Sequence, residues 1–139
     1  MPVIDLRKVL GKKIISAHKA DVALSAPEHA GRDPEQFRST VLLLEGGSRV
    51  LLKHDRLESF ECSDDLESIP IDGAGEYKAT GQTICGVWTN QMGNVYLELA
   101  NGNYLTVNPN QGYYLEFYTT EDMEDLVSGD PVWQLTRML

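Results

Sequence analysis

Residues 95–107 read VYLELANGNYLTV, an alternation of apolar and polar side chains around an Asn-Gly pair, which predicts a β-hairpin. The length of the loop decides which side chains share a face. A two-residue Asn-Gly turn would place Glu98 opposite Leu105 and mix the two faces. A three-residue loop, residues 100–102, pairs Leu97 with Leu105 and keeps the large aliphatic side chains together. We therefore predict the three-residue loop.

A second stretch, residues 40–52, reads TVLLLEGGSRVLL and leads to the same result. A loop of residues 45–47 brings its large aliphatic side chains to one face. Gly47 then takes the last loop position, as Gly102 does in the other hairpin. Such loops need a left-handed backbone at that position, and glycine adopts it without a steric penalty. The two stretches are therefore predicted to be equivalent hairpins.

The segments around the two hairpins also correspond. LGKKIISAHK precedes the first hairpin and TGQTICGVWT precedes the second, and a strand-like LESFEC or YYLEFY follows. We infer an internal repeat of a four-strand meander, about residues 11–62 and 81–118. A polar insertion at 25–38 lengthens the first copy, and residues 63–80 connect the copies. The predicted strands are residues 14–24, 39–44, 48–54 and 57–62 in the first copy, and 83–89, 94–99, 103–108 and 113–118 in the second.

Eight short strands separated by turn residues are typical of a mainly β protein, either an antiparallel sandwich or a partly closed barrel. Short helices are predicted near the N-terminus, at residues 5–10, and near the C-terminus, at residues 121–127. The chain of 139 residues is predicted to form a single domain, residues 1–139. The copies are expected to share one core, because a sheet with one apolar face needs a cover.

The two predicted hairpins differ on their outward faces. Val41, Leu43 and Leu51 of the first hairpin are apolar, whereas their counterparts in the second include Glu98 and Thr106. Both faces of the first hairpin are therefore predicted to be covered. The cover is either the N-terminal helix, which we favour, or another protein chain.

Motifs of catalysis and metal binding are absent from the sequence. No phosphate-binding glycine loop, nucleophile elbow, zinc-protease or EF-hand pattern occurs. His54, Asp55 and Glu58 form the best local imitation of an acid–base or metal cluster, but polar residues are expected at such a turn. An enzyme is not excluded, because catalytic groups can converge from distant positions, yet no motif supports one. We expect no metal and no cofactor.

Composition restricts the compartment and the partners. Cys62 and Cys85 lie in apolar, strand-like segments, where a buried, reduced thiol is the expected state. The sequence has no signal-peptide core and no apolar span long enough to cross a membrane, so we expect a cytoplasmic protein without a membrane partner. A net charge of −9 and a pI of about 4.7 oppose binding to phosphates, so no nucleic-acid partner is expected.

The negative charge is concentrated in the second half of the chain. Residues 1–60 contain 10 Lys or Arg and 8 Asp or Glu, whereas residues 61–139 contain 2 and 13. Two acidic clusters each follow the last predicted strand of a copy. They consist of Glu61, Asp64, Asp65 and Glu67, and of Glu121, Asp122, Glu124 and Asp125.

Two interpretations of these clusters remain open. They are solvated segments that favour helix N-termini and solubility, or they form a surface that meets a basic protein partner, where complementary charge speeds association. Tyr96 and Tyr104, on the outward face of the second hairpin, are candidate aromatic anchors. We favour the second cluster as the partner-binding one, because it adjoins the tyrosine-rich strand at residues 113–118.

A small, acidic, cysteine-poor β domain without catalytic motifs resembles the immunity proteins that bacteria make against interbacterial toxins. The acidic clusters and the paired EGG and ANG hairpins carry the resemblance. It implies an inhibitor that binds and occludes a cognate, basic toxin. One alternative is a homodimeric structural or adaptor module built on the apolar first hairpin. Another is a small-molecule-binding domain or an enzyme with a pocket between the copies.

Overall fold

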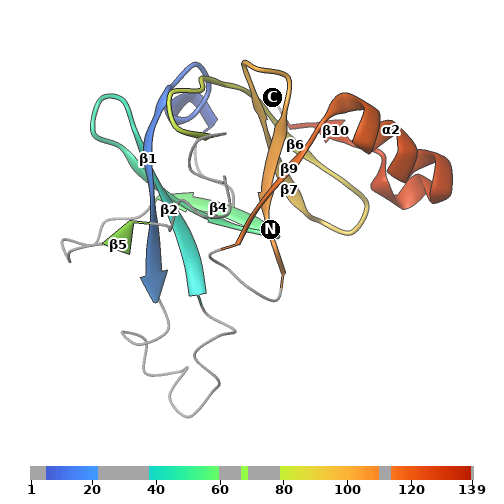
Figure 1. The fold of residues 1–139 in the computed structure, drawn as a ribbon, viewed down its shortest axis with the longest axis horizontal. Coiled ribbons are helices and arrows are strands. Elements are labelled where there is room, and N and C mark those ends of the chain that lie inside the picture. The colour runs from blue at the N-terminus through green and yellow to red at the C-terminus, as the bar shows by residue number, and fades with distance from the viewer. Residues whose placement is uncertain (1–5, 22–37, 60–66, 69–78, 110–113, 139) are drawn as a thin grey trace, which may run out of the picture.

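The computed structural model describes residues 6–21, 38–59, 67–68, 79–109 and 114–138. They form two antiparallel sheets of five strands each (Figure 1). The strand orders are β4-β3-β2-β1-β5 in the first sheet and β10-β6-β7-β8-β9 in the second. The predicted mainly β, antiparallel class is therefore confirmed. The described strands make a sandwich-like pair of sheets and do not close into a barrel.

The first sheet contains β1 (Ile14–Asp21), β2 (Arg38–Leu44), β3 (Arg49–Lys53), β4 (Arg56–Ser59) and β5 (Glu67–Ser68). The second contains β6 (Ile84–Thr89), β7 (Val95–Leu99), β8 (Tyr104–Val107), β9 (Leu115–Tyr118) and β10 (Thr136–Arg137). The helical elements are the 3-10 turns η1 (Leu6–Lys8) and η6 (Pro131–Trp133) and the helix α2 (Thr120–Gly129).

Strands β1 to β4 and β6 to β9 follow each other in the same order within their sheets, which is the predicted meander. β5 and β10 were not predicted. The helix predicted at residues 5–10 is replaced by the short turn η1. The predicted insertion at 25–38 lies outside the described residues except for Arg38, which begins β2. Most of the connection at 63–80 also lies outside them.

The second hairpin has the predicted register and loop. Leu97 pairs with Leu105. Across the loop, the amide of Leu99 donates to the carbonyl of Asn103 at 2.8 Å, which leaves three residues between them. Gly102 ends the loop with a φ of 90°. Other residues rarely adopt this φ, so glycine is required here.

The first hairpin repeats this geometry. Leu42 pairs with Val50, and the amide of Leu44 donates to the carbonyl of Ser48 at 2.8 Å. Gly47 has a φ of 91°. The three-residue loop is thus confirmed in both hairpins.

The first strand of each copy carries a bulge at the same place. The register shifts after Ile14 in β1 and after Ile84 in β6. Ile15 therefore has no paired residue in β2, and Cys85 has none in β7. Both of these residues are exposed. The prediction of a buried Cys85 thiol is therefore wrong, because the bulge turns this side chain out of the apolar alternation. Cys62 lies outside the described residues.

The two copies meet through reciprocal backbone hydrogen bonds. The amide of Gly11 donates to the carbonyl of Ile84 at 2.8 Å, and the amide of Gly81 donates to the carbonyl of Ile14 at 2.7 Å. Both glycines have positive φ angles, 78° and 85°. Each copy therefore supplies the same turn to the first strand of the other.

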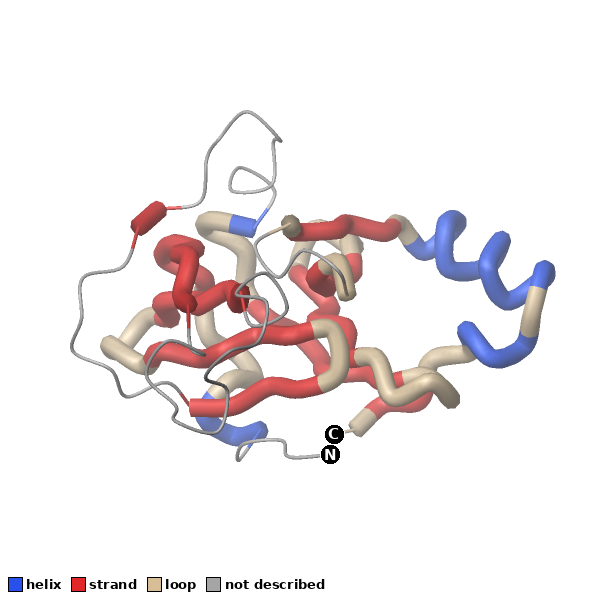
Figure 2. The backbone as a smooth tube through the Cα atoms, turned by 90° about the horizontal axis from the view of Figure 1, so that it is seen from below, coloured by secondary structure: helices blue, strands red, loops and turns tan. Residues whose placement is uncertain are grey.

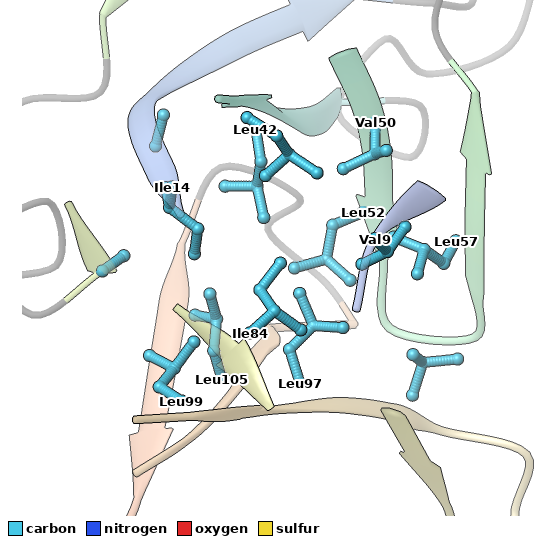
Figure 3. Packing of buried hydrophobic residues seen from close by; sticks show 14 of the residues in the cluster. Val9, Ile14, Leu42, Val50, Leu52, Leu57, Ile84, Leu97, Leu99 and Leu105 are labelled. Carbon is cyan, nitrogen blue, oxygen red and sulfur yellow. The ribbon is translucent and has the colours of Figure 1, made fainter. Parts of the chain in front are cut away.

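The core lies between the two sheets, where apolar side chains from both point toward one another (Figure 3). Val9, which follows η1, packs into the same cluster. A view turned by 90° shows α2 beyond the end of the strands (Figure 2). The fully buried side chains include Ile14, Leu42, Leu52, Leu57, Ile84, Leu97 and Leu105.

The outward face of the first hairpin is covered within the chain. Val41 is 0% exposed and Leu51 is 4% exposed, whereas Leu43 is half-buried. Val9, which follows η1, packs into the core between the sheets, and that core does not include Val41 or Leu51. Val9 is therefore not part of the cover over these two side chains. The prediction that this face is covered is confirmed, and the burial of these two side chains needs no second protein chain.

The outward face of the second hairpin is also more buried than the sequence predicted. Tyr96 is 2% exposed and Thr106 is 4% exposed. The Tyr96 ring on β7 meets the Tyr118 ring on β9 edge to face, with centroids 6.1 Å apart. Because β8 lies between these strands, the two rings meet above the strand that carries Thr106. The Thr106 hydroxyl is buried without a hydrogen-bond partner among the described residues.

Replacing Thr106 by Val is expected to raise the free energy of unfolding by about 1 kcal/mol, because it removes a buried, unpaired hydroxyl and keeps the shape of the side chain. Denaturant unfolding measures the change. Thr106→Ser is the matched control: it keeps the hydroxyl, loses the methyl group and should lower stability. A loss of stability in both variants would show that the hydroxyl has a partner.

Candidate interaction surface

The predicted C-terminal helix is confirmed as α2, and its start explains one of the acidic residues. Thr119 is the N-cap: its hydroxyl accepts a hydrogen bond from the amide of Asp122 at 3.0 Å. In return, the Asp122 carboxylate accepts from the amide of Thr119 at 2.8 Å. This capping box satisfies two amides that the helix leaves unpaired. Asp122 therefore has a structural role.

The other acidic residues of this cluster, Glu121, Glu124 and Asp125, are exposed. The last turn of α2 contains no basic residue. None of the three forms an ion pair with a described residue. The helix projects beyond the second sheet (Figure 1), with Met123 buried beneath it. The structure thus places three carboxylates on a projecting element, without an ion-pair partner in the described part of the chain.

The first acidic cluster is largely outside the described residues, since Glu61, Asp64 and Asp65 are not among them. The backbone of Glu67 lies in β5, where it pairs with Lys19 of β1. The equivalence of the two clusters stays a prediction.

Tyr104 connects α2 to the second sheet. Its hydroxyl is hydrogen-bonded to Thr120, the first residue of the helix, and its ring is partly exposed. Burial and the negative charge of Glu98 raise the pKa of Tyr104 above its ordinary value. The structure therefore brings Tyr104 and the cluster at 121–125 together. Tyr96 shares the outward face but is buried, so it is not a surface anchor.

Four side chains from four strands of the second sheet converge, and we call them the Trp88 cluster: Trp88, Glu98, Tyr104 and Arg137. The indole Nε1 of Trp88 donates to Glu98 Oε1 at 2.8 Å. The rings of Trp88 and Tyr104 meet edge to face, with centroids 6.4 Å apart. The Arg137 guanidinium lies over the Trp88 ring, 5.4 Å from its centroid, and donates to the carbonyl of Cys85 at 2.9 Å. Such an arrangement holds a cation against an aromatic face.

Gly86 forms the floor of the Trp88 cluster. A Cβ at this position would lie 3.0 Å from Glu98 Oε1, 3.0 Å from Trp88 Nε1 and 3.3 Å from Arg137 Nη2. The glycine thus lets three side chains close directly over the backbone. In the first copy, Ser16 occupies the equivalent position, the first pair after the bulge.

A second polar cluster lies on the same face. The Tyr118 hydroxyl donates to Glu116 Oε1 at 2.8 Å, and the Asn108 amide donates to Glu116 Oε2 at 3.1 Å. Burial, followed by the hydrogen bond to Glu116, raises the pKa of Tyr118 well above its ordinary value. Tyr118 therefore remains a neutral donor, and both oxygens of Glu116 are engaged within the fold.

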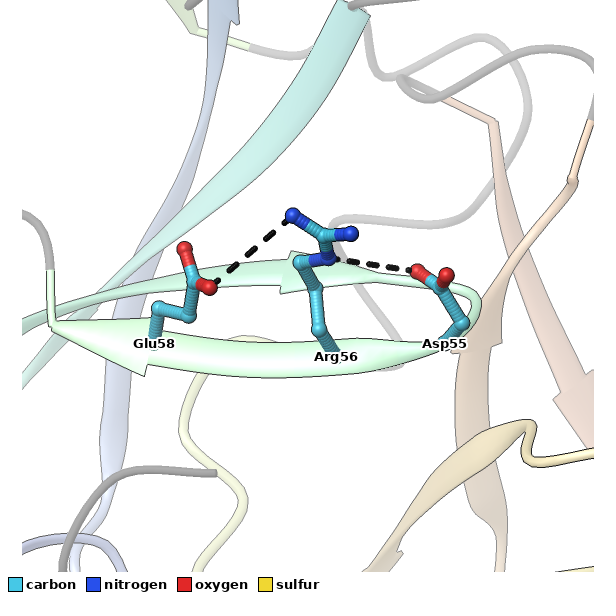
Figure 4. Close-up of polar contacts among 3 residues, drawn as sticks. All are labelled: Asp55, Arg56 and Glu58. Carbon is cyan, nitrogen blue, oxygen red and sulfur yellow. Dashed lines mark ion pairs between the residues drawn. The ribbon is translucent and has the colours of Figure 1, made fainter. Parts of the chain in front are cut away.

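The sequence His54-Asp55-x-x-Glu58 spans the turn between β3 and β4 and the first residues of β4 (Figure 4). Arg56 lies between the two carboxylates, with its Nε 3.5 Å from Asp55 Oδ1 and its Nη1 4.0 Å from Glu58 Oε1. The His54 carbonyl accepts a hydrogen bond from the amide of Val95 at 2.7 Å, which fastens this turn to the second sheet. Within the described ranges, no group of three or more His, Cys, Asp or Glu side chains is arranged to hold a metal ion.

Sequence reasoning selected Tyr104, with Trp88 as a nearby aromatic residue, and the acidic residues of α2, but it missed the convergence of Tyr104 and Trp88 with Glu98 and Arg137. Arg137 reaches Trp88 only because β10 returns to pair with β6. A two-residue strand near the end of the chain leaves no periodic pattern to detect. The one available signal was Gly86, a glycine inside a strand pattern, which often marks a close approach of other groups to the backbone.

Comparison of this chain with protein-family models, with curated proteins and with solved structures finds no match. No described helix is long and apolar enough to cross a membrane.

Proposed function

We propose that this protein is an immunity-type inhibitor, which binds a cognate, basic toxin protein and occludes it. One observation carries the proposal: Glu121, Glu124 and Asp125 are exposed, lack ion-pair partners among the described residues, and adjoin the partly exposed Tyr104. Interfaces combine charge complementarity with aromatic anchors in this way. The resemblance to immunity proteins in size, acidity and β content agrees with it.

The charge of the second sheet and α2 supports a basic partner. Residues 79–138 contain seven Asp or Glu and a single Arg. A surface of this kind attracts a basic protein over several ångströms and raises the rate of encounter. The inhibitor would act by occupying the toxin surface in a stoichiometric complex, without turnover.

The homodimer alternative has lost its main support. It relied on an apolar outer face of the first hairpin that a second copy would cover. Val41 and Leu51 are already buried within one chain, so that face has little apolar surface to offer at these positions.

Affinity capture from the native cell, followed by activity measurements on the captured protein, tests the proposal. We expect the immobilised protein to retain a basic protein whose toxic activity falls linearly with added inhibitor and vanishes at a one-to-one ratio. Capture should weaken as the salt concentration rises. A captured partner that keeps its full activity at saturating inhibitor would contradict the inhibitor function.

A further inference from the structure

We infer that the Trp88 cluster is a docking site for an arginine side chain of the protein partner. The inference rests on the proposed function, which makes the partner basic, and names the group that it inserts. It adds a specific contact on the second sheet to the charge attraction of α2.

The cluster already shows how this surface holds a guanidinium. Arg137 lies 5.4 Å from the centroid of the Trp88 ring and is anchored by its bond to the carbonyl of Cys85. A planar guanidinium stacks on aromatic faces and donates in a fixed fork, which the compact ammonium of lysine does not do. The aromatic surface continues from Trp88 to the ring of Tyr104, which is partly exposed.

Glu98 supplies the acceptor for a second cation. It lies on β7 directly opposite Tyr104 on β8, and its side chain is partly exposed. Its contact within the described part of the chain is the bond from Trp88 to Oε1. Oε2 therefore retains the capacity to accept hydrogen bonds, and a carboxylate accepts from a guanidinium with two parallel bonds when both oxygens face it.

The charge around the cluster also favours a cation. The Tyr104 hydroxyl is hydrogen-bonded to Thr120, so the Trp88 cluster adjoins the helix that carries Glu121, Glu124 and Asp125. Arg137 is the single basic residue between residues 79 and 138. The acidic residues around Glu98 and Tyr104 thus outnumber the single basic residue, Arg137, so the local charge attracts the arginine of a partner.

The fold alone does not require these residues. Equivalent positions in the first copy follow from the matching bulges and registers: Ser16 corresponds to Gly86, and Leu43 corresponds to Glu98. The first copy keeps the same strands and the same bulge without a glycine or a carboxylate there. The convergence over Gly86 is therefore a property of the second copy, beyond what its backbone needs.

A short peptide probe tests the site without knowledge of the partner. The probe is a tetra-arginine peptide amide, compared with tetra-lysine and with tetra-citrulline, whose side chains have a similar planar shape but no charge. The signal is the indole N–H resonance of Trp88 in the nitrogen–proton NMR spectrum, assigned with the variant Trp133→Phe. We expect saturable shifts with tetra-arginine, weaker binding of tetra-lysine and no response to tetra-citrulline.

Two variants locate the peptide. Glu98→Gln keeps an oxygen that accepts from Trp88 but removes the charge, and should weaken tetra-arginine binding about tenfold, the usual effect of losing a charged hydrogen bond. Tyr104→Leu, which removes the ring, should also weaken it. Glu45→Gln, an equal change of charge in the exposed loop of the first hairpin, is the control and should bind like the parent protein.

Equal shifts with tetra-citrulline, or unchanged tetra-arginine binding in both Glu98→Gln and Tyr104→Leu, would overturn the arginine site. That result would leave the inhibitor function to be decided by the captured partner. Conversely, specific arginine binding together with a captured partner that is not inhibited would keep the site and reject the inhibitor function.

Discussion

Leu97→Ala is expected to lower the free energy of unfolding by about 2–5 kcal/mol, the cost of truncating a fully buried leucine. Leu97 is 0% exposed and pairs with Leu105 at the centre of the second hairpin. Its side chain points into the cluster between the sheets (Figure 3). The loss has two parts: the hydrophobic free energy that the removed carbon atoms no longer contribute, and the cost of the cavity that they leave. The cavity persists because the surrounding residues relax only in part. Denaturant unfolding curves measure it.

Two further variants control this prediction. Leu42→Ala changes the equivalent position of the first copy, which is also 0% exposed, and should cost a similar free energy. Ile15→Ala shortens an aliphatic side chain that is 45% exposed in the bulge of β1, and should cost less than about 1 kcal/mol. Similar losses at Leu97 and Ile15 would show that the face assignment of the hairpins is wrong.

Removing the charge of α2 with Glu121→Gln, Glu124→Gln and Asp125→Asn is expected to slow association with the captured basic partner about tenfold or more at low salt. Exposed charges act on the rate of encounter, because their attraction extends beyond the contact surface. The dissociation rate should change less. Binding kinetics at two ionic strengths measure both rates, and the salt dependence of association should become flatter.

Asp122 stays unchanged in this variant because its carboxylate closes the capping box with Thr119. A matched control carries Glu45→Gln, Asp55→Asn and Glu58→Gln, which remove the same number of charges from the first sheet. Its association rate should fall less than that of the α2 variant. If both variants associate at the same rate as the parent protein, α2 has no part in recognition, and the Trp88 cluster becomes the better candidate for the contact.

The hairpins could be predicted because two independent signals agree in each of them. The alternation of large aliphatic side chains, such as Leu97 and Leu105, is compatible with one register. Gly47 and Gly102 stand where that register requires a positive φ. Since both signals are local, no knowledge of the rest of the molecule was needed.

The outward face of the second sheet could not be predicted in the same way. Alternation places Tyr96 and Thr106 away from the core, and they do face away from it. Their burial arises from contacts across strands, such as the meeting of the Tyr96 and Tyr118 rings. Cys85 shows the opposite effect, because a bulge exposes a residue that the apolar pattern would bury.

The candidate site likewise has one part that could be predicted from the sequence and one part that could not. The acidic helix was predictable from composition, and its cap and its end at Gly129 follow ordinary helix signals. The Trp88 cluster depends on four strands and on the return of β10 to β6. Long-range pairing of this kind leaves no local trace beyond the glycine at position 86.

The reciprocal bonds between the copies also determine when the protein can finish folding during synthesis. The carbonyl of Ile14 and the amide of Gly11 find their partners in Gly81 and Ile84, about 70 residues later in the chain. The first meander therefore leaves the ribosome before these backbone groups can meet their partners, which lie at residues 81–84. Contacts so distant in sequence give a high contact order, which slows folding. We therefore expect the nascent first copy to need more protection from aggregation than the finished chain does.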